Sequence, residues 1–152
     1  MTQRIDAAKA APKGYQSFLP ALTYFQDCSL PIELIDLAYL RVSQINGCAY
    51  CIDKHSADLM KRGMPVSKLL LVPVWHEAQA LFSEQERAAL AWSESLTRLE
   101  QTGAPDEAYE QAAAAFNERE LADLSYAIAL MNAMNRIGVG FRMTPAAVKQ
   151  AA

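Results

Sequence analysis

The chain has 152 residues, 52% of them hydrophobic and 20% charged, which is typical of one globular domain and not of a disordered segment. Its formal net charge is −3 and its Lys and Arg residues are scattered, which argues against a nucleic-acid binder and a polybasic membrane patch. Residues 1–13 are polar and alanine-rich, and they have the features of neither a secretory signal nor a membrane span. We therefore expect a single cytoplasmic domain over residues 1–152, with a flexible segment at 1–13.

Apolar residues at helical spacing, with the breaks between them, predict an all-α fold. Asn46-Gly47 is the sharpest break in the chain. Capping-box patterns at Ser83 and Asn117 mark two helix starts, Pro73 is expected to stop a helix, and Pro20 to kink one. The expected helices cover residues 15–26, 31–45, 48–62, 67–72, 83–102, 105–116 and 118–139. No segment has a convincing strand pattern.

The last long helix, 118–139, carries apolar side chains around much of its circumference. A helix of this kind must be buried on most sides, so it is either a central core helix or one shared with a neighbouring subunit. The apolar positions are Leu121, Leu124, Tyr126, Ile128, Leu130, Met131, Met134 and Ile137.

Cys48, Cys51 and His55 stand at positions i, i+3 and i+7 of the helix that follows Asn46-Gly47. At 3.6 residues per turn they lie within about 60° of one another on one helix face. The two sulfurs are within reach of a disulfide, and His55 is one turn beyond Cys51, where it can act as a base. The helix N-terminus favours negative charge on Cys48 most directly. The stripe therefore favours thiol redox chemistry.

Two other interpretations of the cysteines remain open. Cysteines on an apolar stripe are often small core residues. Cys, Cys and His are also good zinc ligands, but a fourth ligand at typical spacing is missing, because Cys28 is isolated upstream and His76 lies well downstream. We expect neither a metal nor a cofactor.

The run from Leu40 to His55, LRVSQINGCAYCIDKH, closely resembles the core motif of the alkylhydroperoxidase D (AhpD) family, within the carboxymuconolactone decarboxylase-like superfamily. Further resemblance runs through Trp75, residues 81–92 and residues 132–136, and the whole covers a core from about 15 to 142. The resemblance implies an AhpD-like helical bundle assembled as a homotrimer or homohexamer. It also implies reduction of hydroperoxides, with recycling by a dithiol partner that in AhpD is a lipoylated protein.

By the same resemblance, Cys51 is the thiol that attacks the peroxide and Cys48 the one that resolves the sulfenic acid. The helix dipole alone would favour Cys48 as the more acidic thiol. We follow the family, because a neighbouring base such as His55 can outweigh a partial dipole charge.

The sequence departs from the AhpD pattern in two places. Asp36 stands where the family has its proton-relay glutamate, so the carboxylate is one methylene shorter, and Glu33 is an alternative one turn earlier. Tyr50 stands where AhpD has a histidine between the cysteines, and a tyrosine is not a base near neutral pH. Both changes bear on the efficiency of the reaction and on its reductant.

The sequence thus predicts a thiol-dependent peroxidase whose catalytic residues are Cys51, Cys48, His55 and Asp36. A general thiol-disulfide oxidoreductase is the alternative within catalysis. A redox-responsive binding or scaffold protein without turnover is the alternative outside it.

Overall fold

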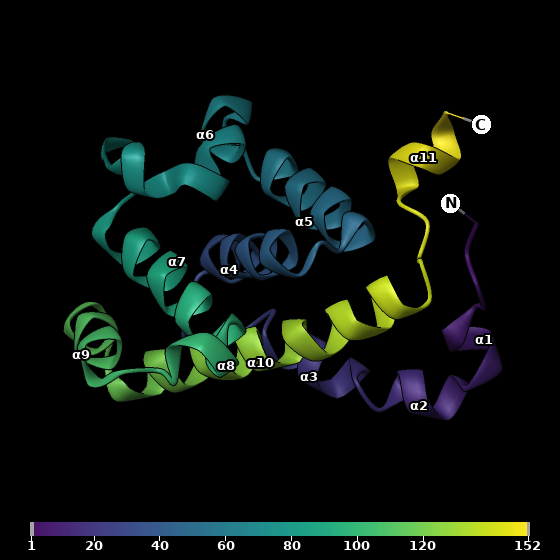
Figure 1. The fold of residues 1–152 in the computed structure, drawn as a ribbon, viewed down its shortest axis with the longest axis horizontal. Coiled ribbons are helices and arrows are strands. Elements are labelled where there is room, and N and C mark those ends of the chain that lie inside the picture. Colours follow the sequence, from purple (N-terminus) through teal and green to yellow (C-terminus); the bar gives the residue numbers. More distant parts are fainter. Residues whose placement is uncertain (1, 152) are drawn as a thin grey trace.

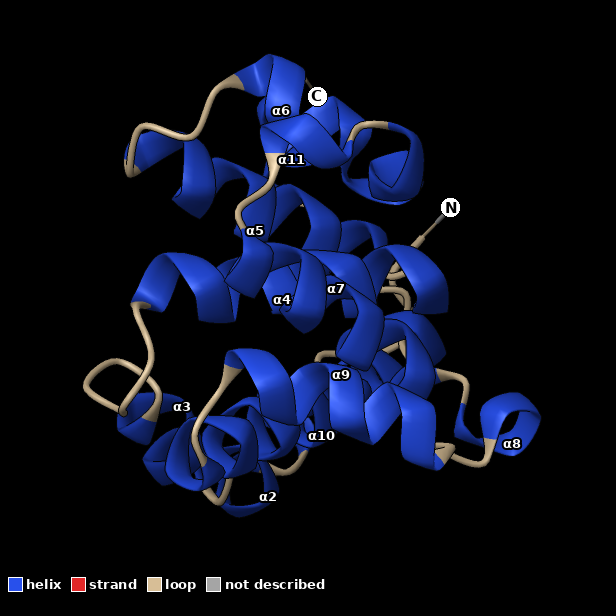
Figure 2. Cartoon of the chain, turned by 90° about the vertical axis from the view of Figure 1, so that its left-hand side faces the viewer, coloured by secondary structure: helices blue, strands red, loops and turns tan. Residues whose placement is uncertain are grey.

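The computed structural model describes residues 2–151, and within this range it contains helices and no strand (Figures 1 and 2). The all-α expectation is confirmed; residues 1 and 152 of the expected domain lie outside the described residues. The α-helices are α1 (Ala7–Ala10), α2 (Pro12–Gln16), α3 (Leu19–Tyr24), α4 (Ile32–Asn46), α5 (Ala49–Lys61), α6 (Val66–Leu71), α7 (Glu84–Thr97), α8 (Leu99–Thr102), α9 (Asp106–Ala115), α10 (Glu118–Gly140) and α11 (Ala146–Gln150). Two 3₁₀ segments, η1 (Val72–Glu77) and η2 (Gln79–Leu81), lie between α6 and α7.

Helix α4 is the central element, and it packs against α5, α7 and α10 (Figure 1). Every residue from 34 to 43 is buried. The polar residues in this stretch, Asp36, Arg41 and Ser43, are paired with side chains of neighbouring helices. One core cluster joins α4 to α7, α9 and α10, and a second joins it to α5, α6, η1 and α7. The functional stripe on α5 therefore rests on the most buried helix of the protein.

The helix ends of the central region follow the sequence signals. Ser83 and Asn117 form the two expected capping boxes, with Glu86 and Glu120 as reciprocal partners. Gly47 ends α4 in the left-handed conformation, with φ of 69°. This conformation is unfavourable for residues with a Cβ, which explains why the sharp turn between α4 and α5 carries a glycine.

Several boundaries differ from the expected ones. The expected 15–26 helix is divided into α2 and α3, and Pro20 lies in the first turn of α3, where its missing N–H costs nothing, instead of kinking a longer helix. The expected 83–102 helix breaks at Arg98 into α7 and α8. Helix α6 ends at Leu71, as expected from Pro73, but the chain continues directly into the 3₁₀ segment η1, and Pro73 lies in the first turn of that segment.

The two ends of the described chain meet near the C-terminal end of α10 (Figure 1). Within residues 1–13 the short helix α1 forms, and Arg4 donates its backbone N–H to the carbonyl of Phe141 at 3.0 Å. The short helix α11, which the sequence pattern did not predict, packs against α5. The N-terminal segment therefore borders the C-terminal end of α10, and the C-terminal segment borders α5.

Helix α10 is buried along one side, where Leu124 and Ile128 have no exposed surface, and open along the other, where Tyr126 is 68% exposed. The expected burial on most sides is thus not reached within one chain. Whether a neighbouring subunit covers the open side stays a prediction. None of the helices in the described chain combines the length and apolar character that crossing a membrane requires.

Candidate redox site

Cys48 caps the N-terminus of α5, and Cys51 follows in the first turn. Cys48 has extended backbone angles, and its Sγ accepts the backbone N–H of Cys51 at 3.4 Å. Both side chains are buried, with 1% and 6% of their surface exposed. Because Gly47 turns the chain sharply before α5, both cysteines face inward toward α4 and α10.

The two cysteines are joined as a disulfide, with their Cα atoms 5.3 Å apart. This separation lies within the range that disulfides require. The structure therefore brings together the pair that the sequence spacing singled out. Cys28 takes no part in it: its thiol is free, half-buried and 3.8 Å from the carbonyl oxygen of Leu30.

His55 lies one turn beyond Cys51 and is held by a carboxylate from α4. Its Nδ1 is 3.0 Å from Oδ1 of Asp36, and both side chains are 7% exposed. Arg62 donates to the other oxygen, Oδ2, of Asp36 at 2.8 Å. A carboxylate that accepts the Nδ1 proton leaves the lone pair of the neutral ring on Nε2, which makes His55 a base directed away from Asp36.

Tyr39 is a site residue that the sequence analysis missed. Its ring centroid lies 5.0 Å from that of His55, and its buried hydroxyl has no hydrogen-bond partner among the described residues. Burial raises the pKa of Tyr39, and the negative charge of Asp36 raises it further. The only signal in the sequence was the position of Tyr39 one turn after Asp36, within a helix whose other residues were expected to form the core.

Glu33 and Tyr50, the two positions where the sequence left alternatives, lie apart from this hydrogen-bonded group. Glu33 is exposed in the first turn of α4 and forms no hydrogen bond within the described chain. Tyr50 is half-buried and lines a surface pocket with Gly47 and Ala49. Of the two candidate carboxylates, Asp36 is the one that contacts His55.

Gly138 of α10 lies directly against the disulfide. A Cβ built on this residue would lie 2.7 Å from Sγ of Cys48 and 3.5 Å from Sγ of Cys51. Distances under 3 Å essentially never occur for a real Cβ, so α10 approaches the disulfide as closely as a bare backbone allows. Sequence reasoning missed this glycine because the contact joins residues far apart in the chain.

Asparagine side chains tie the turn before Cys48 to α10. Asn46 donates from Nδ2 to the side-chain oxygens of Asn132 and Asn135, both at 3.0 Å. Asn135 in turn donates to the hydroxyl of Ser43 at 3.1 Å. These contacts tie α10 to α4, and they fix the Asn46-Gly47 turn that positions Cys48.

Asp36, His55 and Asp58 form a group whose possible ligand atoms lie within 4.8 Å of one another. Burial alone would raise the pKa of Asp58, but the hydrogen bond and charge of Lys54, whose Nζ is 2.8 Å from Oδ2, lower it overall. Arg62 pairs with Asp36 in the same way. A metal ion here would have to compete with both cations, so we assign no metal to this group.

Comparison with known proteins identifies the family. The model of the carboxymuconolactone decarboxylase family matches residues 9–95, which include α4, α5 and all four predicted catalytic residues. The chain belongs to the carboxymuconolactone decarboxylase family. The uncharacterized protein YdfG of Bacillus subtilis (strain 168) is 33% identical over 139 residues, which are 91% of this chain and 94% of that protein.

Solved structures place the fold within the AhpD-like part of this family. A protein of unknown function from Agrobacterium tumefaciens, whose name links it to the antioxidant defence protein AhpD, matches with a TM-score of 0.91 and 38% identity over 95% of this chain and 98% of that one. An uncharacterized peroxidase-related protein from Silicibacter sp. TM1040 matches with a TM-score of 0.77, over 88% of this chain and 71% of its own; at 20% identity it shows the shared fold alone. The AhpD-like helical fold that the Leu40–His55 motif predicted is therefore confirmed.

Proposed function

We propose that this member of the carboxymuconolactone decarboxylase family is a thiol-dependent peroxidase that reduces alkyl hydroperoxides. One observation carries the proposal: the buried Cys48–Cys51 disulfide at the start of α5 lies one turn before a histidine that Asp36 holds through Nδ1. The family's name alone does not assign the reaction. A cysteine pair that can cycle between dithiol and disulfide beside an oriented base is suited to redox chemistry.

The reaction begins with the thiolate of Cys51 attacking the peroxide. Its sulfur bonds to one oxygen, the O–O bond breaks, and the leaving alkoxide takes a proton from the imidazolium of His55 to give an alcohol. Cys51 is then a sulfenic acid. The thiolate of Cys48 displaces its oxygen as water, which takes up one more proton, and the disulfide forms.

Asp36 supports this cycle through His55. Its carboxylate, fixed by Arg62, accepts the Nδ1 proton and keeps Nε2 available to take the thiol proton and return it to the leaving group. Asp36 touches neither the sulfurs nor the substrate in this scheme. It is a positioning residue, and Asp36 rather than Glu33 is proposed for this role because only Asp36 contacts His55.

An external dithiol would close the cycle by thiol-disulfide exchange, and a lipoylated protein stays the proposed type of physiological reductant. We also propose that the protein acts in the cytoplasm as a homotrimer or homohexamer. Tyr126 and Leu99, which are 68% and 53% exposed, are candidate interface residues. Light scattering that reports the mass of a single chain at micromolar concentration would contradict the assembly.

The test counts thiols after one equivalent of hydroperoxide is added to the dithiol protein. The native protein should lose two thiols per chain, and the Cys48→Ser variant should accumulate a trappable sulfenic acid on Cys51. Trapping on Cys48 in the Cys51→Ser variant alone would reverse the two roles, in line with the position of Cys48 at the helix N-terminus. If neither thiol reacts with the peroxide, the proposed peroxidase activity is wrong.

The same samples separate the alternative activities. A general thiol-disulfide oxidoreductase would exchange its disulfide with protein or small thiols and show no peroxide consumption. A redox-responsive scaffold would change mass or partner binding on oxidation without turnover. Decarboxylation of a carboxymuconolactone, the reaction in the family's name, would proceed equally well with both cysteines replaced by serine.

A further inference from the structure

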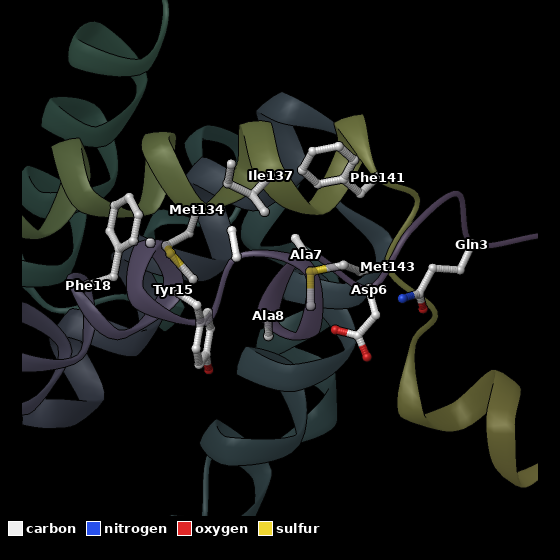
Figure 3. A pocket seen from close by; sticks show the side chains of 12 residues that line it. Gln3, Asp6, Ala7, Ala8, Tyr15, Phe18, Met134, Ile137, Phe141 and Met143 are labelled. Atoms are coloured by element: carbon white, nitrogen blue, oxygen red, sulfur yellow. The ribbon is translucent and has the colours of Figure 1, made fainter.

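A pocket apart from the redox site lies between the N-terminal helices α1 and α2 and the C-terminal half of α10 (Figure 3). Its volume is about 260 Å³. One wall comes from residues 3–18 and the other from residues 134–143, and none of the four residues proposed for the peroxidase lines it. The function proposed above therefore leaves this pocket without a role.

Helix α10 contributes an apolar stripe to the pocket. Met134, Ile137 and Phe141 stand at positions i, i+3 and i+7, so they share one helix face, and Figure 3 shows them across the pocket from α1 and α2. Gly138, the next residue after Ile137, does not line the pocket and packs on the disulfide instead. One helix therefore serves the pocket and the redox site with different residues.

The end of α10 adds a further apolar side chain. Arg142 has a left-handed backbone, with φ of 54°, and the N–H of Met143 returns to the carbonyl of Gly138 at 2.9 Å. This is the hydrogen bond of a Schellman motif, in which the residue after the left-handed position often packs back against the helix. Met143 thereby becomes part of the pocket wall.

Few contacts hold the N-terminal wall against α10. Arg4 donates its backbone N–H to the carbonyl of Phe141 and its Nη1 to the carbonyl of Gly140, both at 3.0 Å. These are the only hydrogen bonds that join described residues 2–18 to residues 134–143. A ligand in the pocket touches both walls, so its binding stabilises the docked position of the N-terminal segment.

The polar side chains of the wall are already engaged or turned away. Asp6 caps α1 by accepting the N–H of Lys9 at 3.1 Å, and its other oxygen lies 3.5 Å from Nζ of Lys9. Gln3 donates to the carbonyl of Ile5 at 3.1 Å, and Figure 3 shows the hydroxyl of Tyr15 directed away from α10. An ordered water needs about two to four polar partners. The pocket therefore favours an apolar occupant over water.

Size and charge define the class of ligand. An apolar cavity of about 150 Å³ binds benzene, so the volume of this pocket has room for about ten non-hydrogen atoms. Asp6 is the one charged residue among the described residues of the wall. A carboxylate would be repelled by Asp6 and would also lose its water among apolar side chains. The rings of Phe18 and Phe141 and the thioether of Met134 favour an aromatic group.

We propose that this pocket binds a neutral, mostly apolar molecule of about ten non-hydrogen atoms, an aromatic ring with a short alkyl chain. The ligand packs between the stripe on α10 and the helices α1 and α2, and it holds the N-terminal segment in place. The binding is non-covalent and involves neither a thiol nor a peroxide. The inference therefore goes beyond the proposed peroxidase and does not depend on it.

The first experiment compares 4-phenylbutan-1-ol with 4-phenylbutanoate, which have nearly the same size and differ in charge. Isothermal titration calorimetry with the full chain at pH 7 measures both. We expect the alcohol to bind with a dissociation constant on the order of 0.1 mM. The carboxylate should bind at least about tenfold more weakly. Absence of alcohol binding, or equal affinities for the two compounds, would overturn the proposal.

Hydrogen exchange shows where the alcohol binds. The amide of Arg4, which donates to Phe141, exchanges when the N-terminal segment leaves α10. Saturating alcohol should slow exchange in peptides from residues 2–18 severalfold and leave peptides from α9 unchanged. Protection at other segments without protection of residues 2–18 would place the ligand elsewhere and contradict the assignment. This measurement needs no variant, so it holds even if a substitution disturbs folding.

The Ala7→Leu variant fills the pocket from α1, because Ala7 lines it and is half-buried. It should keep the native melting temperature and weaken binding of the alcohol at least about tenfold, since leucine occupies the ligand's volume. Ala10→Leu, at an exposed position of the same helix outside the pocket, is the matched control and should bind as the native protein does. Native affinity in Ala7→Leu would reject the site. A lower assembly mass of Ala7→Leu by light scattering would mean that a second copy of the chain fills the pocket, and would reject the small ligand.

Discussion

Gly138 of α10 lies against Cys48 so closely that a Cβ would meet Sγ at 2.7 Å. The same Cβ would lie 3.5 Å from Sγ of Cys51, which is an ordinary van der Waals distance. A single hydrogen in place of a methyl group therefore lets a helix remote in sequence cover the disulfide. The burial of the redox pair depends on α10 as much as on the helix that carries it.

Gly138→Ala should consequently destabilise the oxidised protein although alanine is the better helix former. The methyl group would have to push α10 or the disulfide aside, and overpacking of this kind costs about 1–3 kcal/mol of unfolding free energy. Gly140→Ala is the matched control, since nothing lies within 4 Å of its Cβ position on the same helix. It should be neutral or stabilise by up to about 1 kcal/mol. Urea unfolding of the two oxidised variants measures both changes in unfolding free energy. Equal stabilities of Gly138→Ala and Gly140→Ala would contradict the close packing of Gly138 on the disulfide.

Asp36→Asn should slow the loss of thiols on addition of peroxide. An asparagine amide can donate to Nδ1 of His55, which favours the tautomer with the proton on Nε2 and removes the basic lone pair that the proposed proton transfer requires. Replacing a carboxylate that orients a metal-bound histidine lowers function by roughly 10- to 100-fold, and we expect a fall of this order for the metal-free pair of Asp36 and His55. The measurement is the single-turnover rate of thiol loss at pH 7.

Glu33→Gln provides the matched control for Asp36→Asn. Both variants remove one negative charge from α4, but Glu33 is exposed and has no contact with His55. The single-turnover rate of thiol loss in Glu33→Gln should equal that of the native protein. If Glu33→Gln were the slower variant, the relay carboxylate would be Glu33, and the hydrogen bond between Asp36 and His55 would be structural.

Local features of the site could be predicted from the sequence because they depend on one helix. The stripe of Cys48, Cys51 and His55 follows from helical periodicity, and the sharp start of α5 follows from Gly47. Asp36 was singled out because it stands where the AhpD family has its proton-relay glutamate. Its contact with His55 is a property of how α4 packs on α5, which spacing within one helix does not specify.

The features that were missed involve segments far apart in the chain. Gly138 meets the start of α5 only because α10 packs against it, and a pattern read along the sequence carries no such contact. Tyr39 was hidden in a run of core residues. The breaks at Ser17-Phe18 and Arg98 depend on packing of short helices, which propensity describes poorly.

Asp123 should contribute stability that disappears in acid. Burial alone would raise its pKa, but hydrogen bonds from Ser29 and Tyr24 outweigh burial and hold the pKa below its usual value. The hydroxyl of Ser29 donates at 2.6 Å and that of Tyr24 at 2.7 Å. Because the folded pKa is depressed, the contribution is complete above the unfolded pKa of about 3.9 and is lost as the pH falls through the folded pKa.

Asp123→Asn should therefore lower the unfolding free energy at pH 7 by about 1–3 kcal/mol, because the amide replaces a charged acceptor of several hydrogen bonds. The difference from the native protein should narrow as the pH falls below about 4. Denaturant unfolding between pH 7 and pH 3 measures it. Asp27→Asn, at an exposed position of the same region, should show neither effect. A difference that stays constant over this pH range would mean that Asp123 acts without its charge.

Tyr39→Phe should leave stability at pH 7 within about 1 kcal/mol of the native value, because the hydroxyl it removes is buried without a partner among the described residues. At high pH the variant should be the more stable protein. Burial and the charge of Asp36 raise the pKa of Tyr39, so the folded state holds its proton more tightly than the unfolded state does. Native stability therefore falls as the pH rises above about 10, and the variant lacks this contribution.

Unfolding by urea at pH 7 and pH 10.5 tests both statements, with exposed Tyr126→Phe as the control. A loss of more than about 2 kcal/mol at pH 7 would show that the hydroxyl has a partner, such as an ordered water beside His55.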